Sequence, residues 1–367
     1  MARAKPPDGA EGADGAYEMD GAHEMDAVDG ADGMDGQDAG GGQLPLFGET
    51  PAAPAAPTAG VGAAVPSPEV VALAARLPAG TYLGGSTWSF PGWAGLVYDR
   101  PHPAARLARH GLAAYARHPL LRAVGIDRTH YRPLPAAELA EYAAAVPPDF
   151  LFLVKAHEVC TLAHFPDHPR YGAERGRPNP RFLDAAYAAA EVVAPYAEGL
   201  GARGGALLFQ FAPQELGPPA RFAARLHAFL AALPPGPLCA VELRNRELLT
   251  AHYAAALAAA GACHCLNVHP RMPDVRVQAR LAGVAAGPLT VGRWLLGSGA
   301  TYEETSRRFA PFNRLAAPDP RARRALAELA REALAAGRRV LFTVNNNAEG
   351  CAPLSIVALA RELAASG

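Results

Sequence analysis

Eight short apolar runs, separated by longer segments with helical spacing, recur along residues 81–345 of this chain. Most of the runs are rich in valine, leucine and phenylalanine and have the length of a buried β-strand. A strict alternation of strand and helix favours parallel strands joined by right-handed crossovers, because each helix carries the chain back to the starting edge of the sheet. The expected strands are 81–85, 121–127, 150–155, 206–211, 238–243, 262–268, 289–294 and 340–345.

The segments between these runs place alanine and leucine at i, i+3 and i+4, which predicts helices with one apolar face in the core. Eight strand and helix units in about 290 residues fit a closed (β/α)8 barrel, the TIM barrel, better than an open doubly wound sheet. The connection after the sixth strand is too irregular for a helix to be assigned. The expected helices are 103–117, 136–145, 181–197, 220–232, 247–260, 320–336 and 354–365.

A tail of different composition precedes these segments. Residues 1–50 contain twelve acidic and two basic side chains, a net charge of −10, so a whole-chain net of −1 leaves +9 for the rest. Residues 51–68 carry no charge and are rich in proline, alanine and glycine, which is typical of a linker. Because the first 50 residues hold few large apolar side chains, we expect a disordered acidic tail and linker at 1–68 and a barrel domain at 69–367.

Composition also indicates the cellular setting. No stretch approaches the roughly 18 consecutive apolar residues of a membrane span, and the acidic N-terminus lacks the order of a signal peptide, so we expect a cytoplasmic protein. Five cysteines without a CxxC pair fit reduced thiols. Cys263 and Cys265 lie two apart in an expected strand and would face one side, where packing is a simpler explanation than metal binding.

Lys155 is the only lysine in the expected barrel domain. Lysine and arginine together number 34, and the one other lysine is Lys5, which leaves 32 arginines. Where arginine is so strongly preferred, a retained lysine indicates a place where a guanidinium cannot substitute, because burial lowers the pKa of an ammonium whereas arginine stays protonated. Lys155 ends the apolar run 150–155. A lone amine at the end of a buried strand indicates an active site.

Polar or aromatic side chains stand at the end of every expected strand. In a closed barrel these ends meet at one mouth, where the active sites of this fold lie. Gln210 and Glu242 lie inside apolar runs, and burying an amide or a carboxylate is unfavourable unless the group is paired or faces a cavity. The simpler interpretation, that strands end in polar loops, explains these two residues poorly. The other candidates for the mouth are Trp88, Tyr131, Arg132, Arg244, Arg293, Asn345 and Asn346.

Seven stretches carry a resemblance to a known family: GGSTWSFPGW (84–93), Thr129 with Tyr131 and Arg132, FLVKA (152–156), LLFQFAP (207–213), AVELRN (240–245), VGRW (291–294) and NNNAEG (345–350). In these stretches the chain resembles the YecE-like family, domain of unknown function 72. The resemblance implies a TIM-barrel fold and, Asn345 apart, the same mouth residues, including Lys155, Gln210 and Glu242. It implies no activity, because none is established for the family.

One stretch departs from the family pattern. Where the family usually reads VEINSTFYR, residues 124–132 read VGIDRTHYR, so a glutamate and an asparagine are lost and Asp127 and His130 are gained. The lost acid argues against a mechanism shared with the whole family and indicates a divergent subgroup.

Lys155 and Glu242 form an expected acid and base pair. Opposite charges would keep both groups ionised, while partial burial would shift each pKa toward the working pH. Arg132, Arg244 and Arg293 offer forked donors suited to a carboxylate or a phosphate.

Neutral and aromatic groups complete the expected site. Asn345 and Asn346 supply donors for hydroxyl groups, and Trp88 and Tyr131 supply flat apolar faces for a sugar ring or a base. We therefore expect an enzyme that acts on a small polar anion, phosphorylated or carboxylated, with a sugar-like body as one option. The reaction class stays open.

Three alternatives stay open at this stage. The charged groups could form a network that satisfies only itself, or Lys155 could act as a Schiff-base nucleophile. The sequence requires no cofactor, and the lysine, arginine and amides of the mouth suit a divalent metal poorly, although such a metal is compatible with nearby acids and histidines. The candidate metal ligands are Asp127, His130, His157, Glu242 and His269.

A short motif lies within the acidic tail. Gln43, Leu44, Pro45, Leu46 and Phe47 look like the QLxLF peptide with which bacterial replication and repair proteins bind the DNA sliding clamp. An extended segment with a glutamine and apolar anchors suits a hydrophobic groove. Together with the net charge of +9 after residue 50, the motif predicts an alternative function, a DNA-binding or DNA-processing protein recruited to the clamp. The competing interpretation is an apolar segment that docks on its own barrel.

Overall fold

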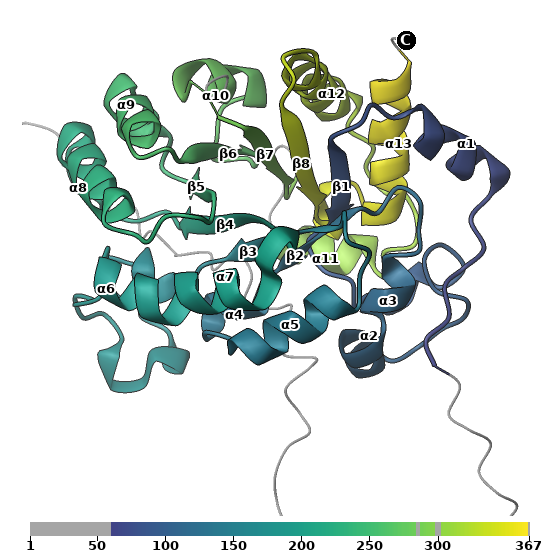
Figure 1. The fold of residues 1–367 in the computed structure, drawn as a ribbon, viewed down its shortest axis with the longest axis horizontal. Helices are drawn as coiled ribbons and strands as arrows, with labels where there is room; N and C mark the ends of the chain where they lie inside the picture. Colours follow the sequence, from purple (N-terminus) through teal and green to yellow (C-terminus); the bar gives the residue numbers. More distant parts are fainter. Residues whose placement is uncertain (1–59, 284–286, 298–301, 366–367) are drawn as a thin grey trace, which may run out of the picture.

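Eight parallel strands close into a barrel surrounded by helices in a computed structural model that describes residues 60–283, 287–297 and 302–365 (Figure 1). The strands follow one another around the barrel in sequence order, and the eighth pairs with the first. The (β/α)8 fold predicted from the alternation is confirmed. The predicted disorder of residues 1–59 and the motif at 43–47 lie outside the described residues.

Each predicted strand is present, and its ends differ from the prediction by no more than two residues. The strands are β1 (Thr81–Gly85), β2 (Ala123–Ile126), β3 (Leu151–Lys155), β4 (Gly204–Phe211), β5 (Cys239–Leu243), β6 (Cys263–Val268), β7 (Leu289–Trp294) and β8 (Arg339–Val344).

Helices cover the outside of the barrel, with α8, α9, α10 and α12 around β4 to β8 and with α5 and α7 on the other side (Figure 1). None of the helices in the described ranges has the length and apolar character needed to cross a lipid bilayer. The α-helices are α1 (Pro68–Arg76), α2 (Ala104–His110), α3 (Leu112–Tyr115), α4 (Arg128–Tyr131), α5 (Ala136–Ala144), α6 (Ala185–Ala188), α7 (Ala194–Leu200), α8 (Pro219–Ala231), α9 (Ala251–Ala259), α10 (Val275–Leu281), α11 (Tyr302–Phe309), α12 (Pro320–Ala335) and α13 (Ala352–Ala364).

The structure changes the predicted helices at two places. The connection after the sixth strand, left unassigned from the sequence, contains α10. The predicted helix 103–117 is divided into α2 and α3 at Gly111, where the backbone lies against the preceding turn. A Cβ at Gly111 would lie 2.6 Å from the carbonyl oxygen of Leu107, so this close approach depends on glycine.

The predicted helix 181–197 starts late and changes its hydrogen bonding midway. Asp184 caps its N-terminus, so the first regular turn is α6. A π-helical turn, Ala189–Val193, then separates α6 from α7. Pro195 has no N–H to donate to the carbonyl of Glu191, which removes one α-helical hydrogen bond at this point.

The folded body begins earlier than predicted. Ala63 forms an antiparallel bridge with Tyr98, and the N–H of Ala64 donates to the carbonyl of Val97 at 2.9 Å. Residues 60–67, assigned to the linker from their composition, therefore belong to the domain, because main-chain hydrogen bonds hold them to the loop after β1.

The barrel has separate inner and outer apolar cores, because successive side chains of a strand point to opposite faces. On β3, Leu151 and Leu153 belong to the inner cluster, whereas Phe152 packs in the outer core with the helices. Cys263 and Cys265 both belong to the inner cluster. Their predicted shared face is confirmed, and they pack there against apolar side chains.

Candidate functional site

On six of the eight strands the last inward-facing position carries a polar side chain, whereas on β1 and β2 that position is a glycine and the polar residue, Ser86 or Asp127, follows directly after the strand. Because side chains alternate between two faces, the position two residues beyond the inner apolar cluster also faces the barrel axis. On β3, for example, Leu153 belongs to the inner cluster and Lys155 follows it. Each of the eight strand ends contributes one residue to what we call the mouth ring: Ser86, Asp127, Lys155, Gln210, Glu242, Asn267, Arg293 and Thr343.

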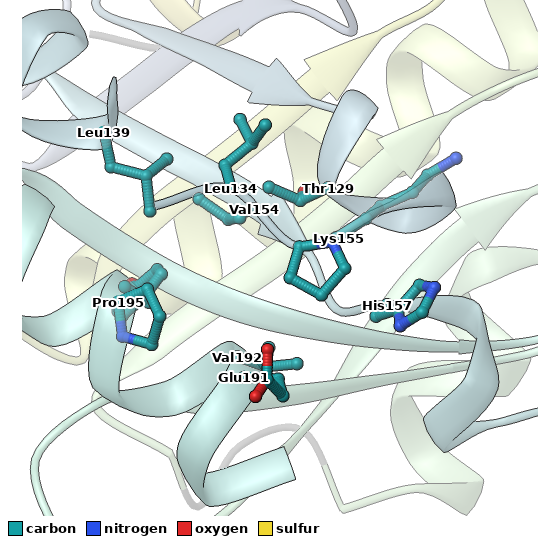
Figure 2. Close-up of a pocket in the computed structure, with 11 residues that line it drawn as sticks. Thr129, Leu134, Leu139, Val154, Lys155, His157, Glu191, Val192 and Pro195 are labelled. Atoms are coloured by element: carbon teal, nitrogen blue, oxygen red, sulfur yellow. The ribbon is translucent and has the colours of Figure 1, made fainter. Parts of the chain in front are cut away.

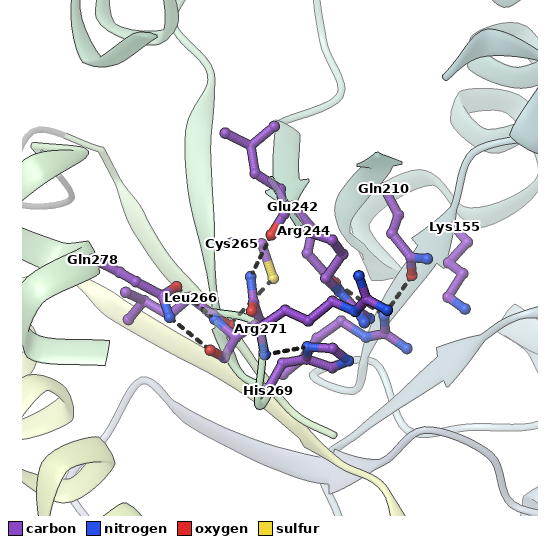
Figure 3. A network of polar contacts seen from close by, with 12 residues as sticks. Lys155, Gln210, Glu242, Arg244, Cys265, Leu266, His269, Arg271 and Gln278 are labelled. Atoms are coloured by element: carbon purple, nitrogen blue, oxygen red, sulfur yellow. Dashed lines mark hydrogen bonds and ion pairs between the residues drawn. The ribbon is translucent and has the colours of Figure 1, made fainter. Parts of the chain in front are cut away.

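Two arginines hold Glu242 in this ring. Arg293 Nη1 lies 2.9 Å from one carboxylate oxygen. Arg244, which is drawn beside Glu242 in Figure 3, has its Nε 2.6 Å from the other oxygen. Burial by itself would raise the pKa of Glu242, but the two arginines outweigh burial and lower the pKa to about 2. Glu242 is therefore an anion at neutral pH.

Arg293 connects Glu242 to the rest of the ring. Its Nη1 also donates to Gln210 Oε1 at 2.9 Å, and its Nη2 lies 3.5 Å from Asp127 Oδ2. Burial by itself lowers the pKa of this guanidinium, but Glu242 and Asp127 raise it above the ordinary value, so Arg293 is a cation. The same oxygen of Asp127 lies 3.2 Å from Lys155 Nζ. A continuous chain of contacts thus runs from Glu242 to Lys155.

Lys155 is a buried amine beside one carboxylate. The residue is 5% exposed, and burial is the main reason why its pKa is lowered. Asp127 opposes this effect and Arg293 adds to it. An ammonium has three N–H donors, and Asp127 is the single ion-pair partner that the described residues provide for Lys155.

The structure changes the predicted pairing of Lys155 with Glu242. The carboxylate beside Lys155 is that of Asp127, whereas Glu242 is held by Arg244 and Arg293. The pKa of Glu242 moves away from neutral pH and not toward it. Glu242 therefore orients two arginines. Asp127, which stood out in the sequence only as a departure from the family pattern and as a candidate metal ligand, takes the position next to the amine.

A second polar cluster lies beside Lys155, between α4 and the loop after β3. Glu158 accepts hydrogen bonds from Arg170 at 2.5 Å and from Tyr171 at 3.1 Å. The guanidinium of Arg170 lies 5.1 Å from the ring centre of Tyr131, and His130 Nε2 lies 3.8 Å from Glu158 Oε2. Sequence reasoning missed Glu158, Arg170 and Tyr171, because they stand in an irregular loop whose residues meet only after folding.

His130 is kept neutral in this cluster. Burial lowers its pKa well below the ordinary value, and the charge of Lys155 lowers it further. Its Nδ1 lies 3.3 Å from the carbonyl oxygen of Ala156, which favours the tautomer with the proton on Nδ1. A neutral imidazole thus stands near the amine of Lys155.

Two of the residues predicted at the mouth, Trp88 and Asn346, are buried and form hydrogen bonds with other parts of the domain. Trp88 is 6% exposed, and its Nε1 donates to the carbonyl of Ala108, so its ring belongs to the outer core. Asn346 Oδ1 accepts from Trp93 Nε1 at 3.2 Å and from the N–H of Ala352 at 2.8 Å. Asn346 therefore joins the loop after β1 to the start of α13.

The remaining predicted residues differ in their burial and contacts. Asn345 is 8% exposed, and its Oδ1 accepts from the N–H of Asn347 at 2.8 Å. Arg132 is exposed to solvent and forms none of the contacts of the ring. Tyr131 is half-buried under Arg170. The structure therefore brings together Lys155, Gln210, Glu242, Arg244 and Arg293, and it places Tyr131 against Arg170.

An opening of about 240 Å³, part of it solvent, lies on the outer side of β3 (Figure 2). Lys155 stands at its edge with the amine directed away from Val192 and Pro195, so only the stem of the lysine lines the opening. The charge of Lys155 therefore belongs to the mouth ring. The lining residues are Thr129, Pro133, Leu134, Leu139, Val154, Lys155, His157, Glu191, Val192, Pro195 and Tyr196.

A family model described as protein of unknown function DUF72 matches residues 82–367, which include the whole mouth ring. The chain belongs to the DUF72 family. This result confirms the resemblance to the YecE-like family, which is the same family. In the DUF72 chain, five of the seven matching stretches supply ring residues, namely GGSTWSFPGW, FLVKA, LLFQFAP, AVELRN and VGRW.

Solved DUF72 proteins share the barrel. The crystal structure of a DUF72 family protein from Enterococcus faecalis V583 has a TM-score of 0.53 and 16% identity, covering 78% of this chain and 96% of its own. One from Thermotoga maritima MSB8 has a TM-score of 0.50 and 18% identity, covering 77% and 97%. At these identities the likeness concerns the fold alone. A comparison with functionally curated proteins found no match.

The predicted metal ligands of this DUF72 protein do not converge. Among the described residues, no three histidine, cysteine or acidic side chains gather in a way that could hold a metal ion. His157 Nδ1 lies 2.6 Å from the hydroxyl of Tyr187, and burial lowers the pKa of His157 to about 4. Asp127 and Glu242 face lysine and arginine. The charged groups at the mouth therefore suit an anion better than a cation.

Proposed function

We propose that this DUF72 protein is an enzyme that acts on a small polar anion at the mouth ring, with Lys155 in direct contact with the anion. The buried ammonium of Lys155 carries this proposal, because one carboxylate faces its three donors within the described part of the chain. An oxygen of a phosphate or carboxylate group would accept a further hydrogen bond and offset the desolvation of the charge.

The neighbours of Lys155 support the same assignment. Arg293 is held in place by Glu242, Gln210 and Asp127, so its planar donors keep one orientation. Asp127 has a side chain that is 23% exposed, which makes it the point where this network meets solvent. A substrate entering there would reach Lys155 and Arg293 first.

Lys155 is also the candidate proton acceptor. Its pKa is lowered, mainly by burial, so its amine gives up a proton more readily than an exposed lysine does. In the fraction of molecules in which Lys155 is neutral, its amine can take a proton from the substrate, and the ammonium formed in this way can then donate to the anionic group. Glu242 takes no part in that transfer, because its pKa of about 2 keeps it ionised. Its role is to position Arg244 and Arg293.

A binding experiment tests this function. Thermal unfolding is measured with and without inorganic phosphate or acetate for the parent, Lys155→Met and a charge-matched control, Arg109→Met, which alters an exposed residue on α2. We expect the anions to raise the midpoint of the parent and of Arg109→Met but not of Lys155→Met. An equal response of all three proteins would contradict the proposal. Lys155→Arg keeps the charge, so this variant should bind anions but lose turnover.

A second candidate function rests on the sequence of the tail, and we propose it separately. The stretch Gln43, Leu44, Pro45, Leu46, Phe47 would bind a bacterial DNA sliding clamp and bring the basic barrel domain to DNA. Surface plasmon resonance on immobilised clamp, comparing the parent with a Leu46→Ala, Phe47→Ala double variant, tests the contact. Equal binding of both proteins, or none, would exclude it. Filter binding to DNA at several salt concentrations tests the barrel, and affinity without a salt slope would count against DNA.

A further inference from the structure

Three buried polar atoms of the mouth ring have no hydrogen-bond partner within the described residues. They are Ser86 Oγ, Thr343 Oγ1 and Asn267 Oδ1. Ser86 is 3% exposed, Thr343 is 1% exposed and Asn267 is fully buried. Buried polar groups in native proteins are nearly always paired, so three orphans in one ring call for an explanation.

These three groups lie on one arc of the barrel. Asn267 on β6 is the register partner of Arg293 on β7, and Arg293 is the register partner of Thr343 on β8. The N–H of Ser86 donates to the carbonyl of Val344 at 3.1 Å, which places Ser86 beside Thr343. The unpaired groups therefore follow one another around the ring on both sides of Arg293.

The other arc of the ring is occupied by charge pairs. Asp127, Lys155, Gln210 and Glu242 come from β2 to β5, and each contacts an oppositely charged or hydrogen-bonding partner. The ring thus has a charged arc and a neutral arc, and Arg293 belongs to both.

The donors and acceptors of the neutral arc determine which ligand groups can form hydrogen bonds with it. The Nδ2 of Asn267 donates to the carbonyl of Leu243 at 3.1 Å, so its Oδ1 is the end that faces away and can only accept. The hydroxyls of Ser86 and Thr343 can both donate and accept. A ligand group that satisfies Asn267 must carry a donor, and a ligand hydroxyl can satisfy all three positions.

We infer that the mouth ring binds a polyhydroxylated anion, with the acidic group at Lys155 and Arg293 and the hydroxyl groups along Asn267, Thr343 and Ser86. This inference rests on the proposed function and narrows its substrate class to sugar phosphates and sugar acids. Recognition of hydroxyl groups by buried polar partners is also a strong source of selectivity, because an analogue without hydroxyls leaves these partners unpaired.

Matched ligand pairs test the inference. Isothermal titration calorimetry compares glucitol 6-phosphate with hexyl phosphate, and gluconate with hexanoate, since the members of each pair share a six-carbon chain and the acidic group. We expect the parent to bind the hydroxylated member of one pair at least about tenfold more tightly. The phosphate pair and the carboxylate pair distinguish the two possible acidic groups.

Two near-isosteric variants assign the preference to the ring. Ser86→Ala and Thr343→Val should each reduce the affinity for the hydroxylated ligand by about threefold to tenfold and leave that for its hydroxyl-free partner unchanged. Both variants should unfold at the same temperature as the parent or higher, because they remove an unpaired buried hydroxyl. Ser355→Ala is the matched control, since Ser355 Oγ on α13 is also buried and unpaired but lies outside the ring.

The outcomes separate this inference from the proposed function. Equal affinity of the parent for both members of each pair would overturn the hydroxyl inference and leave anion binding intact. If none of the four ligands binds, and anions change the thermal midpoint of the parent and of Lys155→Met equally, both the hydroxyl inference and the proposed function are wrong. Loss of stability in Ser86→Ala and Thr343→Val with unchanged selectivity would show that the hydroxyls serve the fold, and would also overturn the inference.

Discussion

Lys155 Nζ lies 3.2 Å from Asp127 Oδ2 in the mouth ring. The side chain of Asp127 is 23% exposed, whereas that of Lys155 is only 6% exposed. The pair joins the ends of β2 and β3, which are neighbours in the barrel. Burial disfavours the ammonium more than Asp127 favours it, so the pKa of Lys155 lies below its ordinary value. The protonation of Lys155 therefore depends on Asp127.

Replacing Asp127 should lower the pKa of Lys155 further. In Asp127→Asn the largest favourable charge near the amine is gone, while burial and Arg293 remain. Reductive methylation with ¹³C-formaldehyde and NMR titration of the dimethyl-lysine signal give the pKa directly, because Lys5 is the only other lysine. Asp149→Asn, at an exposed pair with Arg122, should leave the pKa unchanged. Identical titration curves for the parent and Asp127→Asn would contradict the assignment.

The stability of the parent relative to Lys155→Met should increase with pH. The folded protein holds the Lys155 proton less tightly than the unfolded chain, so the unfolded chain binds more protons between the folded pKa and the ordinary value of 10.5. The free energy of unfolding of the parent therefore rises across this window, and the variant lacks the effect. Urea unfolding of both proteins at pH 7, 8.5 and 10 measures the difference. A difference that stays constant or falls would refute the lowered pKa.

Glu242→Gln should destabilise the protein by about 3–5 kcal/mol, because it leaves two buried arginines without their shared anion. Glu69→Gln, which affects an exposed pair with Arg361, should change stability by less than about 1 kcal/mol. Urea unfolding at neutral pH provides both values.

The effect of Glu242→Gln should diminish in acid. The folded pKa of about 2 lies below the ordinary value of 4.5, so the stabilisation by Glu242 is complete above pH 4.5 and is lost as the pH falls toward 2. The gap between the parent and the variant should narrow across that range. A gap independent of pH would contradict the arginine-stabilised carboxylate.

Asn346→Ala should lower stability by about 1–3 kcal/mol without changing anion binding, because it leaves the buried N–H groups of Trp93 and Ala352 without their acceptor. Asn313→Ala, at an exposed position, should be nearly neutral. Chemical unfolding and the phosphate response are measured together. A variant with normal stability and lost anion response would return Asn346 to the site predicted from the sequence.

Gly84→Ala should destabilise the barrel by about 3 kcal/mol or more. A Cβ at Gly84 would lie 1.7 Å from the carbonyl oxygen of Ala123, and the pairing of β1 with β2 consists of Gly84 with Ala123 and Gly85 with Val124. The methyl group would separate the two strands. Gly287→Ala is the control, since its Cβ would meet Cys263 at an ordinary 3.5 Å. Equal thermal midpoints for both variants would show that the strands can move apart freely.

Local patterns predicted much of the site. The run FLFLVK identifies a buried strand ending in an amine, and the alternation of faces places Lys155, Gln210, Glu242 and Arg293 toward one axis. Ser86 and Asn267 also stand among the polar residues at the expected strand ends, but neither they nor Thr343 were chosen as candidates, because neutral side chains are ordinary where strands end in loops. Their importance depends on missing hydrogen bonds, which only a three-dimensional arrangement reveals.

The sequence could not predict which charged side chains form ion pairs. The sequence offered Glu242 as the natural partner of Lys155, whereas in the structure Arg293 on β7 contacts Glu242 on β5, and the carboxylate of Asp127 lies beside both Lys155 and Arg293. Trp88 looked like a binding surface because it follows a strand, but the chain turns there and buries its ring beside Ala108.

The sequence by itself determined the barrel and the residue types at its mouth, because periods of 2 and 3.6 residues decide which side chains face the core. The tertiary structure decided which charges meet and which polar atoms stay unpaired. Asp127 and Lys155 stand 28 positions apart, and Glu242 and Arg293 stand 51 apart, so only the closed barrel and its register bring them within contact. Electrostatic energy depends on those distances and on burial, and neither quantity is encoded in the local pattern.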